Sequence, residues 1–357
     1  MEFTVMVATA GQGILRSNDD GRTWHRLGLK EAIEFDGVVR ALAVDPTRPE
    51  RVYAGADCGL CISDDGGAHW RRAEGPINGM TVWSIAIDPS QPLVLYAGTG
   101  APSRSALFKS TDAGESWQRL PPEMPEFCQG VNRPRMLTIC VNPDDGQDVW
   151  FGVEEGGAWR SRDGGQHFER LDDPRKAIRS SDIHAISILP ASASASASAS
   201  ASASASAPRT FVVLTVNAVY VSQDDGQTWD AKLSKQRFDG LYYTRTVLPL
   251  PGSDNELLMA IGDGTPGFKT RLYRSADRGF NWEQTRLDVA PNSTFWALGG
   301  HAADATRLYA GTKYGDLFCS RDGGRSWQKE WREFPEITAV AWTPFEAPLV
   351  AHVQSID

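Results

Sequence analysis

The octapeptide Ser-Asp-Asp-Gly-Gly-Ala-His-Trp at residues 63–70 belongs to the motif that decides the fold of this chain. Its pattern is Ser-x-Asp-x-Gly-x-x-Trp, and the serines of successive copies lie 45 to 61 residues apart. One copy has Phe168 in the place of the tryptophan. Self-similarity at a near-constant period is the signature of a repeat architecture. The seven copies begin at Ser17, Ser63, Ser110, Ser161, Ser222, Ser275 and Ser320.

The chemistry of this motif predicts a tight turn between two β-strands. The aspartate can accept hydrogen bonds from backbone N–H groups of its own turn, and the glycine adopts a backbone conformation that other residues resist. The aromatic residue then opens the next strand and offers a large apolar surface for burial. A calcium site at the turn is disfavoured, because one carboxylate supplies too few oxygen ligands.

Strand-like segments frame each turn. In the second repeat, segments 52–55 and 59–63 precede the turn, and a run that ends in Asp-Pro at residues 45–46 precedes both. Four antiparallel strands per repeat, A to D, with the Asp turn joining C to D, make one blade of a β-propeller. The sequence therefore predicts an all-β fold, a single seven-bladed β-propeller domain that spans residues 1–357.

The two ends of the chain fit a closed ring. The chain begins with strand-like segments at 3–8, 13–17 and 24–27, and a strand A follows near its other end at 337–344. We expect the N-terminal strands to pair with this C-terminal strand in one blade, which would leave no open sheet edge. Residues 349–353 could add another strand or form a tail.

A strict Ala-Ser alternation occupies residues 191–207, between Pro190 and Pro208. It has no charged, aromatic or large apolar residue, so it cannot form a core of its own. We expect a low-complexity loop, inserted between strands A and B of one blade.

The composition narrows the class of partner. The net charge of −9 argues against nucleic-acid binding, which needs a basic face. No apolar stretch reaches the length of a transmembrane helix, and no basic cluster suggests a membrane surface site. The five cysteines are scattered, and the N-terminus reads as a strand without the basic start of a signal peptide. These features indicate a cytoplasmic protein.

Strand direction predicts that the B–C and D–A loops share one face, opposite the Asp turns. These loops are long and varied, so this face is the candidate functional surface. Aligning the A strands places one residue per blade at the mouth of the channel, namely Arg40, Trp83, Leu137, His184, Arg245, Trp296 and Thr338. The predicted ligand-binding residues are Arg40, Trp83, Arg135, His184, Tyr242, Arg245, Trp296 and Tyr314. If the site is catalytic, the expected acid and base come from Asp57, Glu154 and Asp263.

Structural roles remain open for several of these residues. A lone arginine is more often a solvated or inter-blade charge, and the tryptophans could simply cap the channel. No metal site is predicted, because His184 has no Cys or His at metal-ligand spacing. No cofactor is predicted either, because the chain lacks a phosphate loop and a dinucleotide fingerprint.

With its Asp turns in every blade, the chain resembles the BNR/Asp-box propeller superfamily over essentially its whole length. That superfamily includes sialidases, xyloglucanase-type glycoside hydrolases, sortilin-like receptors and a photosystem II assembly factor. The Phe/Tyr-Arg-Ile-Pro motif of sialidases is absent, so sialidase activity is not expected. The loops around Asp57 and Asp263 are partly similar to the catalytic loops of xyloglucanases, which pair two propellers around their cleft.

Three functions follow from these features. The first is a binding scaffold that holds a small anionic molecule, a peptide or a protein partner at the channel mouth. The second is a glycoside hydrolase or lyase that acts on a sugar-like ligand with carboxylates at the same mouth. The third is an assembly factor that holds a component of a larger complex. Because fold says little about activity, binding is the main hypothesis.

Overall fold

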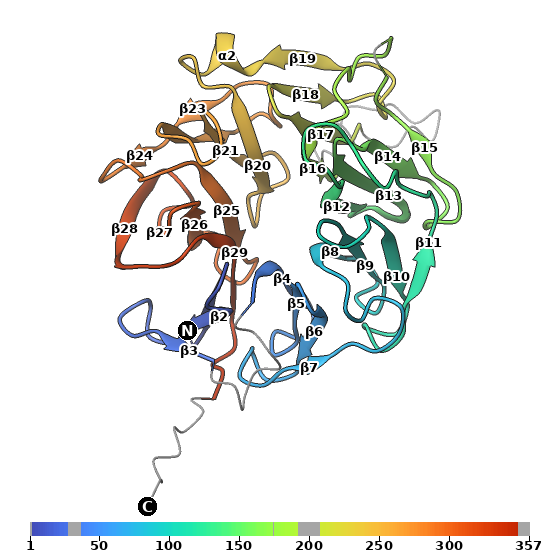
Figure 1. The fold of residues 1–357 in the computed structure, drawn as a ribbon. Coiled ribbons are helices and arrows are strands. Elements are labelled where there is room, and N and C mark those ends of the chain that lie inside the picture. The colour runs from blue at the N-terminus through green and yellow to red at the C-terminus, as the bar shows by residue number, and fades with distance from the viewer. Residues whose placement is uncertain (1, 28–36, 174, 192–207, 349–357) are drawn as a thin grey trace, which may run out of the picture.

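The computed structural model describes residues 2–27, 37–173, 175–191 and 208–348. Figure 1 shows seven β-sheets arranged in a ring, which confirms the predicted all-β, seven-bladed propeller. The Ala-Ser segment, apart from Ala191, lies outside the described residues. Within the described part of the chain, no helix is both long and apolar enough to cross a membrane.

We number the blades in the order in which they follow around the ring, and give the strands of each from the innermost outward. Blade 1 contains β29 (Ile337–Thr343), β1 (Thr4–Thr9), β2 (Ile14–Ser17) and β3 (His25–Arg26). Blade 2 contains β4 (Val39–Val44), β5 (Val52–Ala56), β6 (Gly59–Ser63) and β7 (Arg71–Arg72). Blade 3 contains β8 (Val82–Ile87), β9 (Leu95–Thr99), β10 (Leu107–Ser110) and β11 (Gln118–Leu120). Blade 4 contains β12 (Arg135–Asn142), β13 (Asp145–Glu154), β14 (Gly157–Ser161) and β15 (Glu169–Arg170).

Blade 5 contains β16 (Ile183–Leu189), β17 (Thr210–Thr215), β18 (Ala218–Ser222) and β19 (Asp230–Leu233). Helix α2 (Ser234–Arg237) leads to blade 6, with β20 (Tyr243–Pro249), β21 (Leu257–Gly262), β22 (Thr270–Ser275) and β23 (Glu283–Gln284). Blade 7 contains β25 (Phe295–Gly300), β26 (Leu308–Thr312), β27 (Asp316–Ser320) and β28 (Ser326–Glu333). Its sheet gains a fifth strand, β24 (Arg286–Leu287), because the segment that leaves blade 6 pairs in parallel with β28. This fifth strand was not expected from the repeat.

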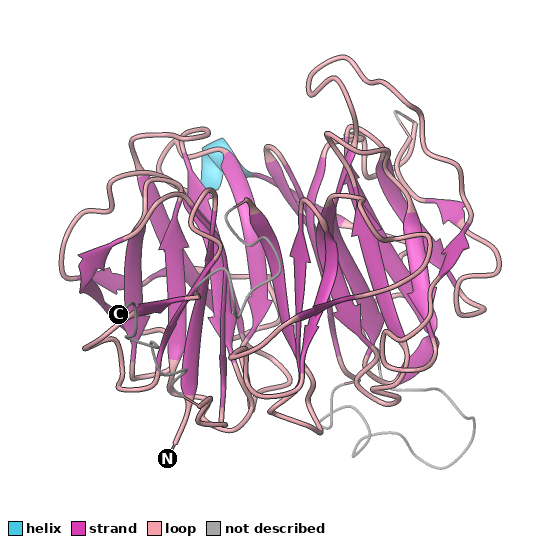
Figure 2. Ribbon diagram, turned by 60° about the horizontal axis from the view of Figure 1, so that its bottom comes forward, coloured by secondary structure: helices cyan, strands magenta, loops and turns pink. Residues whose placement is uncertain are grey.

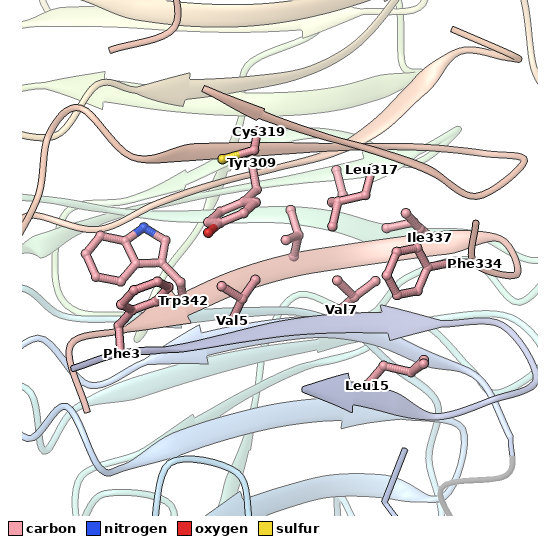
Figure 3. Packing of buried hydrophobic residues seen from close by; sticks show 12 residues of the cluster. Phe3, Val5, Val7, Leu15, Tyr309, Leu317, Cys319, Phe334, Ile337 and Trp342 are labelled. Carbon is pink, nitrogen blue, oxygen red and sulfur yellow. The ribbon is translucent and has the colours of Figure 1, made fainter. Parts of the chain in front are cut away.

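Blade 1 closes the ring as predicted, because β29 pairs antiparallel with β1. Trp342 lies opposite Val5 in this pairing. Figure 3 shows the core beside this joint, where Trp342 and Phe3 pack near Tyr309 of β26. Since Tyr309 belongs to blade 7, this cluster joins the last strands of the chain to the first.

Glycines in the second strand of several blades let the next blade approach closely. A Cβ atom on Gly55 of β5 would lie 2.8 Å from the backbone oxygen of Val82 in blade 3. A Cβ atom on Gly152 of β13 would lie 2.4 Å from a methyl carbon of Ile183 in blade 5. Real side chains cannot make such contacts, so these glycines are required by the packing of blade against blade.

The Asp turns have one common hydrogen-bond pattern, illustrated by blade 2. The Ser63 hydroxyl donates to Asp65 Oδ1 at 2.9 Å and accepts from the Gly67 N–H at 2.8 Å. Asp65 Oδ1 also accepts from the His69 N–H at 2.8 Å, and the Trp70 indole donates to the Gly67 carbonyl at 3.0 Å. The serine–aspartate bond recurs in all seven turns. The motif is therefore structural, as its chemistry predicted.

Replacing Asp65 with asparagine is expected to lower the free energy of unfolding by about 1 kcal/mol at neutral pH. Burial alone would raise the pKa of Asp65, but hydrogen bonds from His69 and Ser63 outweigh it and lower this pKa below its usual 3.8. The ionised carboxylate thus stabilises the fold above the unfolded pKa, and this contribution is lost as the pH falls through the folded pKa.

Urea unfolding of the wild type and D65N at several pH values between about 7 and 2 measures this effect. The difference between the two proteins should shrink toward the acid end. The substitution Glu74→Gln, at an exposed position, is the control and should change stability little at any pH. A difference between wild type and D65N that stays constant with pH would contradict the assignment.

Candidate functional site

A cavity of about 380 Å³ lies where the innermost strands begin. Figure 2 shows the loops that emerge from the two faces of the ring, with α2 on the upper one. Because α2 belongs to a D–A connection, the upper face carries the B–C and D–A loops, opposite the Asp turns. The cavity receives side chains from the first residues of all seven inner strands and from the loops on this face.

Each inner strand carries an irregularity in register at its start. In blade 6, Thr244 pairs with Ile261 and Thr246 pairs with Ala260, so Arg245 has no partner between them. The other six blades show the same shift. A β-bulge adds one residue to a strand and re-aims its side chain. The seven residues left over by these shifts, which all line the cavity, are Arg40, Trp83, Leu137, His184, Arg245, Trp296 and Thr338.

We call these seven residues the bulge ring. Aligning the seven inner strands of this chain with one another predicts the same seven positions at the channel mouth. The structure explains why these positions share one environment. The hydrogen-bonded ladder leaves them unpaired, so their side chains are free to differ from blade to blade. The bulges therefore explain why the side chains at the mouth differ from blade to blade although the fold of the blades repeats.

Two tryptophans of the bulge ring each contact two cationic side chains. The Cζ atoms of Arg40 and Arg135 lie 4.1 and 5.1 Å from the ring centroid of Trp83. At the other tryptophan, Trp296, the Arg245 Cζ atom lies 3.6 Å and the Lys313 Nζ atom 4.3 Å from the centroid. Aromatic faces attract cations, so these stacks hold the charged groups in place at the mouth.

Three of the four cationic residues are paired with carboxylates. Arg40 Nε lies 3.0 Å from Asp57 Oδ1, and Arg135 Nη1 lies 3.0 Å from Glu154 Oε2. Burial lowers the pKa of Arg40, and the Asp57 charge opposes this shift. The third pair is formed by Lys313 and Glu336. These pairs neutralise most of the local positive charge.

Arg245 differs from the other three. It is 8% exposed, and within the described chain no carboxylate forms an ion pair with it. Its Nη1 atom is buried without a hydrogen-bond partner. A buried donor of this kind costs about 1–3 kcal/mol, more when it is charged. Arg135 Nε is also a buried donor without a hydrogen-bond partner, but Arg135 is paired with Glu154. Arg245 thus combines unused hydrogen-bonding capacity with the lack of a carboxylate partner among the described residues.

His184 of β16 contacts two residues of β20 in the next blade. Its Nδ1 atom lies 2.6 Å from the Thr244 carbonyl oxygen, and its ring centroid lies 4.9 Å from that of Tyr243. Burial raises the pKa of Tyr243. Ligand atoms of Glu154, Asp182 and His184 all lie within 4.8 Å of one another. These three residues could hold a cation.

The structure separates the residues predicted from sequence into two groups. Those that line the cavity are Arg40, Trp83, Arg135, Glu154, His184, Arg245 and Trp296. Asp57 lies behind Arg40 as its ion-pair partner. Tyr242 and Tyr314 are 40% and 55% exposed on the loops around the cavity and are not part of its lining.

Asp263 serves its own loop. Its Oδ1 atom accepts hydrogen bonds from the Phe268 and Lys269 N–H groups at 2.8 and 3.0 Å. Burial would raise the pKa of Asp263, but these backbone hydrogen bonds outweigh burial and lower it. A carboxylate held in its ionised form is a poor general acid.

Lys313, Glu336 and Asp182 belong to the mouth but were not predicted from the sequence. Lys313 follows β26 directly, and Asp182 and Glu336 stand just before β16 and β29. The position next to a strand end on the functional face was the available signal, since Asp182 and Glu336 each stand two residues before a residue of the bulge ring. Lys313 and Glu336 pair across two blades, which spacing alone does not show.

No protein-family model matches this chain. A xyloglucanase of Acetivibrio thermocellus is 25% identical over 86% of this chain and 41% of its own length. Among solved structures, the GH74 xyloglucanase of Xanthomonas campestris superposes with a TM-score of 0.64 at 18% identity, covering 92% of this chain and 53% of that one. YCF48 bound to D1 peptide gives a TM-score of 0.50 at 18% identity and covers 82% of each chain.

The chain thus spans about two fifths of that curated relative. At these identities the solved structures inform on fold. The predicted resemblance holds at that level: this chain is a seven-bladed β-propeller with the fold of the GH74 xyloglucanase and YCF48 propellers.

Proposed function

We propose that this propeller binds an anionic ligand, one that carries a carboxylate or phosphate group, at the bulge ring. The observation that carries the proposal is the buried, unpaired Nη1 atom of Arg245, stacked beside Trp296 at the cavity. A carboxylate or phosphate oxygen would satisfy this donor with a charge-assisted hydrogen bond, which is stronger than a neutral one. The indole would offer an apolar surface to the rest of the ligand.

The charge balance of the mouth supports an anion. The residues that line the cavity include Arg40, Arg135, Arg245 and Lys313, against Glu154 and Glu336 as carboxylates. Because Arg40, Arg135 and Lys313 are paired with Asp57, Glu154 and Glu336, the charge of Arg245 is the one among these four that no carboxylate of the described residues neutralises. An anionic ligand would neutralise it. An acidic peptide falls within the same chemical class.

Replacing Arg245 with glutamine is expected to weaken anion binding about 10- to 100-fold. This corresponds to about 1.5–3 kcal/mol for a lost hydrogen bond to a charged group. Calorimetric titration with inorganic phosphate, citrate and an acidic peptide, at constant ionic strength, measures the effect. The probe that binds most tightly is then titrated into each variant.

Arg104→Gln is the matched control, because Arg104 is an exposed arginine on the same face and is paired with Glu126. It should bind the probe like the wild type. Equal weakening in both variants would mean a diffuse electrostatic effect, and unchanged binding in R245Q would refute the proposal.

A second candidate is hydrolysis of a glycoside, favoured by the sequence similarity to the Acetivibrio xyloglucanase. Carboxylate oxygens of Glu154 and Asp182 lie within 4.8 Å of each other, so two carboxylates that could act as acid and base come together at the mouth. Release of reducing ends from xyloglucan oligosaccharides tests this function. Activity in the wild type that is lost in Glu154→Gln would establish it, and absence of turnover would remove it.

A further inference from the structure

In the Glu154–Asp182–His184 cluster, two atoms that can only accept hydrogen bonds lie close together. A carbonyl oxygen can only accept, so the 2.6 Å contact with Thr244 requires that His184 Nδ1 carries the proton. In the neutral imidazole, Nε2 then carries a lone pair and can only accept a hydrogen bond. Yet this Nε2 atom lies 3.3 Å from Asp182 Oδ1, which is also an acceptor. A proton or a cation must lie between them.

The surrounding groups favour a cation. His184 is 4% and Glu154 9% exposed, so both side chains are largely buried at the edge of the cavity. Glu154 Oε2 and Asp182 Oδ1 are buried atoms without hydrogen-bond partners. Arg135 Nη1 faces Glu154 Oε2 at 3.0 Å without hydrogen-bond geometry, so it neutralises part of the charge but leaves the oxygen coordinatively free.

We propose that His184, Glu154 and Asp182 bind one divalent transition-metal ion, with Zn²⁺ as the best match. Zinc accepts a mixed set of imidazole and carboxylate ligands, and three protein ligands leave a coordination position open toward the cavity. A metal-binding histidine commonly donates its other ring N–H to a backbone carbonyl, as His184 does to Thr244. Carboxylates alone would suit Ca²⁺ or Mg²⁺, but the imidazole shifts the preference to transition metals.

The geometry requires modest closure around the ion. Zinc bonds of about 2.0–2.2 Å place tetrahedral ligand atoms about 3.3–3.6 Å apart. The His184–Asp182 pair already meets this at 3.3 Å, and all three atoms lie within 4.8 Å. Asp182 stands in the loop before β16 with its side chain 27% exposed, so it is the ligand with room to move.

Sequence spacing could not reveal this site. Asp182 and His184 are two residues apart at the start of β16, while Glu154 ends β13 in the neighbouring blade. The bulge at His184 breaks the alternation of the strand and turns its ring toward Glu154. The site is independent of anion binding by Arg245, so either proposal can fail alone.

Calorimetric titration of ZnCl₂ into the chain of residues 1–357, freed of metal with EDTA and then dialysed, tests the proposal. We expect one equivalent to bind, and at least a tenfold loss of affinity in His184→Gln. His167→Gln is the matched control: His167 also faces a carboxylate, Asp163, at 2.7 Å, but is an exposed residue of an Asp turn and belongs to no three-ligand group among the described residues. This control should bind zinc like the wild type.

If H184Q does not fold, as judged by circular dichroism, Asp182→Asn replaces it, because Asp182 is a partly exposed loop residue. Anomalous diffraction at the zinc edge should then show the ion between these three side chains in the wild type. Absence of an equivalent of bound zinc, or equal affinity in H184Q or D182N, would overturn the proposal. In that case a protonated His184 paired with Asp182 explains the contact.

Discussion

Replacing Trp342 with alanine is expected to lower the free energy of unfolding by about 3–5 kcal/mol. Trp342 is 1% exposed on β29, the strand that closes the ring. Its ring meets Phe3 edge to face, with centroids 6.1 Å apart. The truncation leaves a large cavity at the joint between the two ends of the chain, where the surrounding residues come from two blades. Urea unfolding followed by circular dichroism measures the change.

Trp331→Ala is the matched control. Trp331 is 69% exposed on β28, and its indole donates one hydrogen bond to the Gly21 carbonyl at 2.8 Å. We expect a loss of about 1 kcal/mol or less there. Similar losses at both positions would show that closure through β29 contributes little to stability.

Replacing Arg160 with leucine is expected to cost about 3–5 kcal/mol, because it leaves a buried carboxylate without its partner. Arg160 Nε lies 2.7 Å from Asp148 Oδ1, and the two side chains are 2% and 4% exposed. The same guanidinium reaches Asp225 of blade 5 at 2.6 Å and so joins two blades. Burial would lower the pKa of Arg160, but the hydrogen bonds to Asp148 and Asp225 outweigh it and raise this pKa.

Two further variants separate the buried pair from surface electrostatics. The double variant Asp148→Leu with Arg160→Leu should be more stable than R160L alone, since it removes both charges. Arg162 also pairs with Asp225, at 2.7 Å, but is 54% exposed. Arg162→Leu should therefore cost less than about 1 kcal/mol. A large loss in R162L with little loss in R160L would contradict this account.

The fold follows from local signals in the sequence. Each Asp turn is stabilised within one short segment, as in Ser63 and Asp65, so its sequence pattern is sufficient to identify it. Seven such turns follow one another at regular spacing. The N-terminal segment supplies strands B, C and D of one blade and the last strand supplies its strand A, so few arrangements other than a closed ring are possible. The parallel strand β24 was missed because it depends on how the chain happens to cross from blade 6 to blade 7.

The site was only partly predictable. Aligning the inner strands identifies the bulge ring, because its position relative to the following strand is the same in every blade. What distinguishes Arg245 from Arg40, however, is the presence of Asp57 beside only one of them. Such pairings join loops of different strands or blades, and no pattern within a single repeat encodes them.

The most direct test of the proposed function is a crystal structure of the protein soaked with the anion that binds most tightly in solution. The account predicts an oxygen of that anion at about 2.7–2.9 Å from Arg245 Nη1, with the body of the ligand against Trp296. Density for the anion only on the Asp-turn face or on the outer strands, with the mouth of the ring free of it, would contradict the account.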